Sequence, residues 1–156
     1  MSDTLCIQID TLRCGDQIQL DEKVNASFLC LDECDELKAV SEITVCGKFY
    51  RVDRWIGIDA RVSVVFCLPC ALCNESFECA IELPQWVHEE EIAQLSKGQW
   101  DVREPLREAI LVEVPFFAQC GGSKCGNFGS IQQFVRSEDG ETPFKDLDSI
   151  IQLQQG

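Results

Sequence analysis

The chain has 156 residues, the length of one ordinary domain, and 46% of them are hydrophobic and 26% charged. Asp and Glu number 27 against 13 Lys and Arg, which gives a formal net charge of -14. Such a charge repels nucleic acid and anionic membranes overall and suits a basic partner. No stretch approaches the roughly 20 apolar residues of a membrane span, and MSDTLCIQID lacks the features of an export signal. We therefore expect a cytoplasmic protein with no membrane partner.

The first third of the chain carries short alternations of apolar and polar residues, which are typical of half-buried strands. A short strand is expected at Leu5–Ile9, and a strand-like piece around Ile18 and Leu20. The segment Leu37–Val52 is rich in β-branched and aromatic residues and is expected to be extended.

The longest alternation runs from Ile56 to Phe66 and predicts the most secure strand of the chain. It leads directly into the cysteine-rich stretch FCLPCALCNESFEC, and a second alternation follows from Phe77 to Leu83. The cysteines are therefore expected at the turn of a β-hairpin. Pro84 is expected to end the regularity of the second strand, because proline cannot donate a backbone hydrogen bond.

The next part of the chain changes in character. Residues 88–100 are polar and predict a loop with some helix. Asp101 and Glu104 resemble a capping box, and Pro105 suits the first turn of a helix that Pro115 ends.

Residues 116–129 are a loop by composition, and a second helix is expected to begin at Thr142 and Pro143, with an apolar stripe behind it. We expect one α+β domain spanning 1–156, with a β-rich part of antiparallel strands at 1–83. The remainder, 84–156, is expected to hold the two helices and a second cysteine-bearing loop.

Two close pairs of cysteines stand far apart in the sequence: Cys70 with Cys73, and Cys120 with Cys125. Close cysteine spacings in a reducing compartment favour metal or redox chemistry over disulfides, and the total of 11 cysteines is odd. Four thiolates suit a tetrahedral, structural Zn²⁺ site. We therefore predict these four cysteines as zinc ligands, closing the fold around a cysteine knuckle.

A site of four thiolates and one Zn²⁺ carries a charge of about -2 and needs amide donors nearby. Gly121, Gly122 and Gly126 are expected to expose such amides. Cys67 is a possible substitute for Cys70, although its position in the alternation places it on the face opposite Phe66.

The alternative is that the cysteines are small buried hydrophobic residues. We assign this role to the remaining cysteines, which are Cys6, Cys14, Cys30, Cys34, Cys46 and Cys79. An iron–sulfur site is a further alternative, but the fourth cysteine and proline of a ferredoxin run are missing. A thiol redox enzyme is disfavoured, because its Cys-x-x-Cys would begin a helix and not join two strands.

Other enzyme signals are weak. His88 is the only histidine, and it lies in an acidic polar stretch where a solvated role is expected. The glycines of the second cysteine loop lack the setting and spacing of a phosphate-binding loop. We therefore expect a protein that is not an enzyme.

One local feature runs against the acidic total. Lys48, Arg51, Arg54 and, further along, Arg61 are interleaved with aromatic residues. Cations beside stacking aromatics can contact RNA or a partner protein, so these four residues are a candidate contact surface. The favoured interpretation is a hairpin with aromatic residues in the core and solvated charges.

With these pieces placed, most of the chain resembles the bacterial YceD family, the large ribosomal RNA subunit accumulation proteins. The similarity lies in the order and spacing of several modest motifs. The matching residues are Val62 to Phe66 with Cys70, Cys73 and Phe77; then Asp101, Glu108, Ile110, Leu111, Val114 and Pro115; then Cys120 and Cys125; then Pro143, Phe144 and Leu147. Two features depart from the family pattern: Leu72 stands where members commonly have arginine, and the Cys120 to Cys125 spacing is not the commonest.

The resemblance implies a non-enzymatic factor that supports accumulation of large-subunit ribosomal RNA and ribosome biogenesis. The acidic charge then favours a basic ribosomal protein, or a ribosomal RNA–protein complex, as the partner. The functional alternatives are a thiol-based redox or iron–sulfur protein, and a metal-stabilised interaction module unrelated to the ribosome.

Overall fold

The structure is a computed structural model, and it describes residues 5–33, 35–95, 97–121, 125 and 126. The chain divides into two compact units, Met1–Cys120 and Gly121–Gly156. All the helices and strands within the described residues belong to the first unit. The expected single domain spanning 1–156 stays a prediction.

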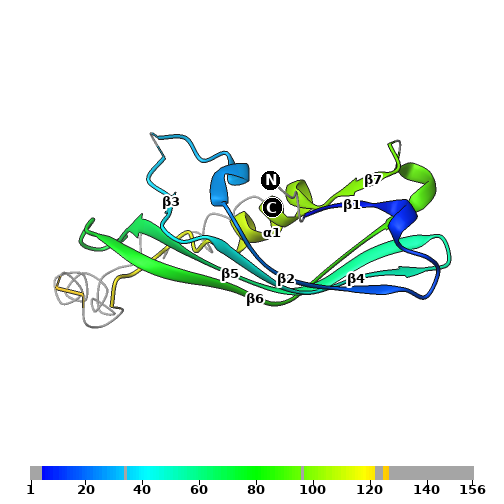
Figure 1. Cartoon of the computed structure of the whole chain (residues 1–156). Helices are drawn as coiled ribbons and strands as arrows, with labels where there is room; N and C mark the ends of the chain where they lie inside the picture. The colour runs from blue at the N-terminus through cyan, green and yellow to red at the C-terminus, as the bar shows by residue number, and fades with distance from the viewer. Residues whose placement is uncertain (1–4, 34, 96, 122–124, 127–156) are drawn as a thin grey trace, which may run out of the picture. The chain divides into compact units, whose positions relative to one another are not determined.

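Seven strands, one α-helix and three short 3-10 helices make up the described part (Figure 1). In chain order they are β1 (Cys6–Gln8), η1 (Ile9–Thr11), β2 (Gln17–Val24), η2 (Ala26–Leu29), β3 (Lys38–Ala39), β4 (Ile43–Val52), β5 (Trp55–Pro69), β6 (Ser76–Glu91), η3 (Ile92–Gln94), β7 (Gln99–Asp101) and α1 (Arg103–Glu113).

The main sheet is antiparallel and runs β2-β4-β5, with β3 and β6 also paired to β5. A separate antiparallel pair, β1 with β7, lies with α1 on one side of this sheet (Figure 1). We call the sheet face turned toward them the inner face. The prediction of a β-rich, antiparallel α+β fold with a cysteine hairpin is confirmed in this coarse form.

Strand β5 is the centre of the sheet, and its sequence explains why. The residues of the predicted alternation all lie on the inner face and are at most 3% exposed. They are Ile56, Ile58, Ala60, Val62, Val64 and Phe66. A strand that buries one complete face strongly resists a slip in register, because a one-residue shift would turn every apolar side chain to the other face.

The expectation that Pro84 ends the regularity of its strand is confirmed, although β6 itself continues through it to Glu91. The register explains how proline is accommodated. Ala60 pairs with Trp86 and Val62 with Leu83, so Arg61 faces two residues of β6 in a bulge. Among the described strands only β5 pairs with β6, and a proline at a bulge of such a strand removes little from the ladder.

Residues 88–100 also differ from the expected loop. Residues 88–91 complete β6, and the helical part is the single turn η3, Ile92–Gln94. His88 is half-buried, with 29% of its side chain exposed, and is not fully solvated as predicted. Its ring is stacked between Trp86 and Trp100, at centroid distances of 6.2 and 6.0 Å.

Helix α1 forms where the sequence predicted a helix, but its first turn is built differently. Val102 is the N-cap residue and makes no side-chain cap hydrogen bond, so the predicted capping box is wrong. Asp101 instead accepts from the Arg103 amide at 3.0 Å, and also from the Arg103 guanidinium. Leu106 and Ile110 are fully buried against the core. Within the described ranges α1 is the one α-helix, and the helix expected from Pro143 lies outside them.

On the outer face of the sheet, Gly57 makes room for an aromatic side chain. A Cβ atom built on Gly57 would lie 2.3 Å from Cζ of Tyr50, its register partner on β4. The Tyr50 hydroxyl donates to Glu89 on β6, so this side chain bridges three strands. Burial and the neighbouring Glu89 carboxylate raise the pKa of Tyr50 above its usual range.

Replacing Gly57 with alanine is therefore expected to displace the Tyr50 ring and break its hydrogen bond to Glu89. The cost should be about 1–3 kcal/mol, measured as the free energy of unfolding in urea. In a Tyr50→Ala background the same substitution should cost less than about 0.5 kcal/mol, because the clash is gone. Equal costs in the two backgrounds would show that the tyrosine does not explain the glycine.

Candidate metal centre

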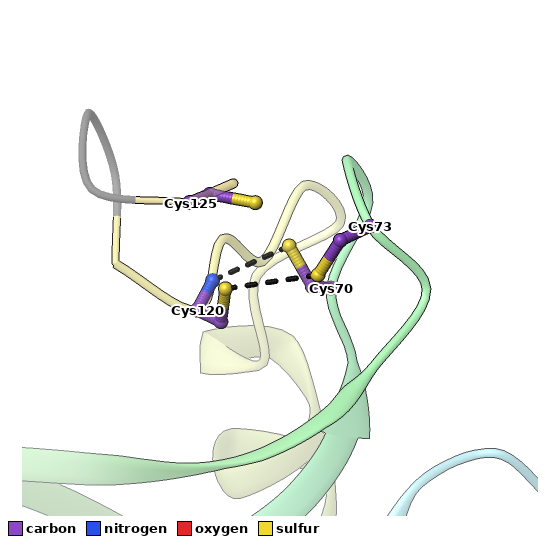
Figure 2. A group of neighbouring side chains, drawn as sticks. All are labelled: Cys70, Cys73, Cys120 and Cys125. Carbon is purple, nitrogen blue, oxygen red and sulfur yellow. Dashed lines mark hydrogen bonds between the residues drawn. The ribbon is translucent and has the colours of Figure 1, made fainter. Parts of the chain in front are cut away.

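A tight turn between β5 and β6 carries the first cysteine pair (Figure 2). The Cys70 amide donates to the Glu75 carbonyl at 2.9 Å, and the Asn74 amide donates to the Cys70 carbonyl at 2.8 Å. Asn74 has a φ of 61°, a left-handed conformation that asparagine tolerates well. These bonds hold Cys73 one turn away from Cys70, on the same side of the knuckle.

Cys120 reaches the knuckle from the segment that follows α1. The Ala71 amide donates to the Ala118 carbonyl at 2.8 Å, which ties that segment to the turn. The Cys120 amide in turn donates to Cys70 Sγ at 3.4 Å. A backbone contact and an N–H···S contact thus fix Cys120 beside the first pair, inside the first compact unit.

The spacing of the sulfur atoms fits a metal. Cys73 Sγ and Cys120 Sγ are 3.8 Å apart. Four sulfurs at about 2.3 Å from a tetrahedral Zn²⁺ are separated by about 3.8 Å. Within the first unit, the sulfur atoms of Cys70, Cys73 and Cys120 all lie within 4.8 Å of one another, so these three cysteines could hold a metal ion (Figure 2).

Cys125 belongs to the second unit, whereas the other three cysteines belong to the first. Its availability as a ligand follows from chain connectivity. It stands five residues after Cys120, and a chain of that length spans at most about 18 Å. The sequence therefore keeps a fourth thiol close to the three that the first unit positions.

The electrostatics of the knuckle favour a thiolate at Cys70. Its side chain is only 2% exposed, yet backbone amides aim at its sulfur. Hydrogen bonds from Cys120, then Cys73 and Leu72, lower the pKa of Cys70 to about 6, against the opposing effect of burial. A group held as thiolate at neutral pH is ready to bind a metal without first losing a proton.

The metal-free protein is expected to show a thiolate ultraviolet absorbance step with a midpoint near pH 6. The pKa of Cys70 is lower in the folded than in the unfolded chain. Its contribution to stability is therefore complete above the unfolded thiol pKa, about 8.5, and is lost as pH falls through about 6. Absorbance titration of the metal-free protein, with Cys70→Ser as control, measures the step. A first step above pH 8, or a step near 6 that survives Cys70→Ser, would contradict this assignment.

The donors to Cys70 were not foreseen in the sequence. The predicted donors were glycines beside the second cysteine pair, whereas the amides of Leu72 and Cys120 each donate to Cys70 Sγ at 3.4 Å. Gly122 lies outside the described residues. The Leu72 donor could have been predicted from the Cys-x-x-Cys spacing, because the amide two positions after the first cysteine points back at its sulfur.

None of the other cysteines in the described ranges joins the cluster. Cys67, the possible substitute ligand, is outside it. The assignment of the others to the core is wrong for three of them, because Cys14, Cys30 and Cys46 are exposed. Cys6 and Cys79 are half-buried, and Cys79 packs against the core. Cys34 lies outside the described residues.

The four basic residues of the candidate RNA or partner contact do not share one face. Lys48 lies opposite Asp59, and Arg61 opposite Cys46, both on the outer face. Arg51 is used inside the fold, where its Nη1 donates to the Leu12 carbonyl at 2.9 Å. Arg54 lies in the β4–β5 turn, with its Nε 3.5 Å from Oε1 of Glu91. An RNA or partner contact at these residues stays a prediction.

No family model, curated protein or solved structure matches this chain. In the part of the chain that the structure describes, no helix has the length and apolar character needed to cross a membrane.

Proposed function

We propose that Cys70, Cys73, Cys120 and Cys125 bind one structural Zn²⁺ ion. The observation that carries this is the 3.8 Å separation of Cys73 Sγ and Cys120 Sγ, which matches the edge of a ZnS₄ tetrahedron. Thiolates are soft ligands that select zinc over the harder cations. Four protein ligands leave no open coordination position for a substrate, which favours a stabilising role over a catalytic one.

Metal analysis of protein purified without chelator tests the zinc assignment directly. We expect one zinc per chain and a colourless preparation. Stoichiometric iron with a visible colour would instead favour the iron–sulfur alternative. No metal, together with fast titration of these thiols by a disulfide reagent, would favour the thiol redox alternative.

We further propose that the protein is a cytoplasmic, non-enzymatic factor that supports accumulation of large-subunit ribosomal RNA. The support is the resemblance to the YceD family in the order of its motifs, together with the cysteine hairpin. A basic ribosomal protein, or a ribosomal RNA–protein complex, is the proposed partner, because a net charge of -14 attracts a cationic surface.

Depletion of the protein from its own cells tests this role. We expect the ratio of large- to small-subunit ribosomal RNA to fall, and expression of the wild-type chain to restore it. An unchanged ratio would overturn the ribosomal role and leave a metal-stabilised interaction module as the better description. Protein carrying Cys120→Ser should restore the ratio poorly if the metal site supports the active fold.

A further inference from the structure

Among the strands that the structure describes, β6 lies at an edge of the main sheet. Its 16 residues pair with β5 on one side. No other strand in the described ranges pairs with it on the other side. Its first half, Ser76–Leu83, precedes the bulge and keeps a regular register with β5. We call these eight residues the edge segment.

The hydrogen bonds of β5 show which backbone groups of the edge segment point outward. The Val65 amide donates to Ser41 Oγ at 2.9 Å, and its carbonyl accepts from the Val40 amide at 3.0 Å. Both bonds lie on the β3 side, so Val65 does not bond to Ala80, its register partner on β6. Opposite residues of an antiparallel pair exchange both bonds or neither. The amide and carbonyl of Ala80 therefore point away from β5.

The same alternation directs the backbone groups of Glu78 and Glu82 outward. All three residues are exposed. Cys79 Sγ approaches the Ala80 carbonyl at a long 4.0 Å, and this leaves the outward amides available for a new strand. Three successive outward positions are enough to pair with a segment of about five residues.

The side chains of the edge segment differ between its two faces. The outer face carries the carboxylates of Glu78 and Glu82, which form no ion pair with any described residue. The inner face carries Phe77, Cys79 and Leu83, which are half-buried against the core. β6 contains five glutamates and neither Lys nor Arg. An added strand would therefore meet negative charge on one face and apolar surface on the other.

The acidic character continues beside the start of the edge segment. A cleft of about 480 Å³ there is lined by three acidic residues, Glu33, Asp35 and Glu36, and one basic residue, Lys38, together with Ser76.

We propose that the edge segment binds an extended segment of a basic partner protein by strand addition. The bound segment alternates Lys or Arg, which face Glu78 and Glu82, with apolar residues, which extend the inner-face core. Main-chain hydrogen bonds to the outward groups of β6 supply affinity, and the alternating side chains supply specificity.

A second copy of this chain fits the edge poorly. An antiparallel pair of two edge segments centred on Ala80 would place Glu78 of each copy opposite Glu82 of the other. Like charges directly opposite one another are destabilising, and each chain carries a net charge of -14. The glutamates thus block self-association and leave the edge open to a segment of opposite charge.

This inference rests on the proposed function only for the class of partner, a basic ribosomal protein. The edge can bind a basic segment whether or not the protein affects ribosomal RNA. If the binding surface is wrong, the peptide will not bind, but depletion will still lower the RNA ratio. If the ribosomal role is wrong, depletion will leave the ratio unchanged, but the peptide will still bind.

The test uses the full chain, loaded with zinc, and a fluorescent peptide of alternating lysine and valine with blocked ends. We expect saturable binding that weakens as salt is raised, and slower amide exchange at Glu78, Ala80 and Glu82. A peptide with glutamate in place of lysine, and one of the same composition with its lysines and valines in separate blocks, should bind at least about tenfold more weakly.

Two matched variant pairs test the geometry. Ala80→Pro removes an outward amide without touching the β5 ladder, and should weaken binding at least about tenfold, whereas Ala80→Thr keeps the amide and should change it less than about threefold. Glu78→Lys with Glu82→Lys should weaken binding by a similar factor. The control is the double variant Glu22→Lys with Glu108→Lys, which makes the same change in net charge away from the edge segment. It should weaken peptide binding much less.

The proposal would be overturned if the two charge-reversed proteins bound the peptide equally well. It would also be overturned if the peptide slowed amide exchange at other strands and not at the edge segment. If Ala80→Pro does not fold, judged by its zinc content and circular dichroism, the charge-reversed pair decides the question alone.

Discussion

Cys120→Ser is expected to lose stoichiometric zinc and most of the stability that the metal supplies. Serine keeps the backbone amide that donates to Cys70 Sγ but removes the sulfur that lies 3.8 Å from Cys73 Sγ. A zinc site contributes its binding free energy to folding, because the unfolded chain holds no preformed site. With a hydrophobic core of its own, the chain should remain folded but lose more than about 4 kcal/mol, measured by urea unfolding in the presence of zinc.

Cys46→Ser is the matched control for this substitution. Cys46 is an exposed thiol on β4, outside the cluster, with its sulfur 3.1 Å from Asp21 Oδ1. We expect this variant to keep one zinc per chain and to change stability by less than about 1 kcal/mol. The metal assignment would be wrong if Cys120→Ser kept a full zinc, or if both variants lost the same amount of stability.

The sequence predicts well those parts of the fold that one residue pattern dominates. The alternation from Ile56 to Phe66 is long and has no competing interpretation, and β5 forms there. The cysteine hairpin follows from two alternations on either side of a turn. Helix α1 follows from an apolar stripe and a proline that suits its first turn.

The incorrect predictions concern residues whose environment is set by partners distant in the sequence. The sequence neighbours of His88 are polar and predict a solvated ring. In the fold, Trp100 of β7, 12 residues later, stacks on that ring. Arg51 is predicted to be a solvated cation, but its guanidinium donates to the carbonyl of Leu12, 39 residues earlier in the sequence.

The candidate metal centre shows the same division. The close pairs in the sequence predict the ligands, and the three of them in the first unit, Cys70, Cys73 and Cys120, do come together. The amides that lower the pKa of Cys70 were not visible as a set, because one of them comes from Cys120, 50 residues away. The exposed thiols Cys14, Cys30 and Cys46 show that cysteine content alone does not identify a core residue.

Trp100→Ala is expected to be the most damaging substitution outside the metal centre. Trp100 is the largest fully buried side chain, at 1% exposure, and it lies on β7. Its ring meets Phe49 of the main sheet edge-on at 6.0 Å and stacks with His88 at the same distance. Its Nε1 donates to Glu90 Oε2 at 2.9 Å. One side chain thus joins the β1–β7 pair to the inner face of the main sheet.

Removing this ring should cost about 3–5 kcal/mol, because it leaves a large cavity and takes a hydrogen bond from the half-buried Glu90 carboxylate. Trp100→Phe keeps an aromatic ring and removes the Nε1–H donor, so about 1–2 kcal/mol is expected. Trp55→Ala is the control, since Trp55 is 43% exposed at the start of β5 and its replacement should cost less than about 1 kcal/mol. Urea unfolding of the zinc-loaded proteins orders the three variants. A cost for Trp100→Ala no larger than that for Trp55→Ala would mean that the β1–β7 pair contributes little to the stability of the sheet on which it packs.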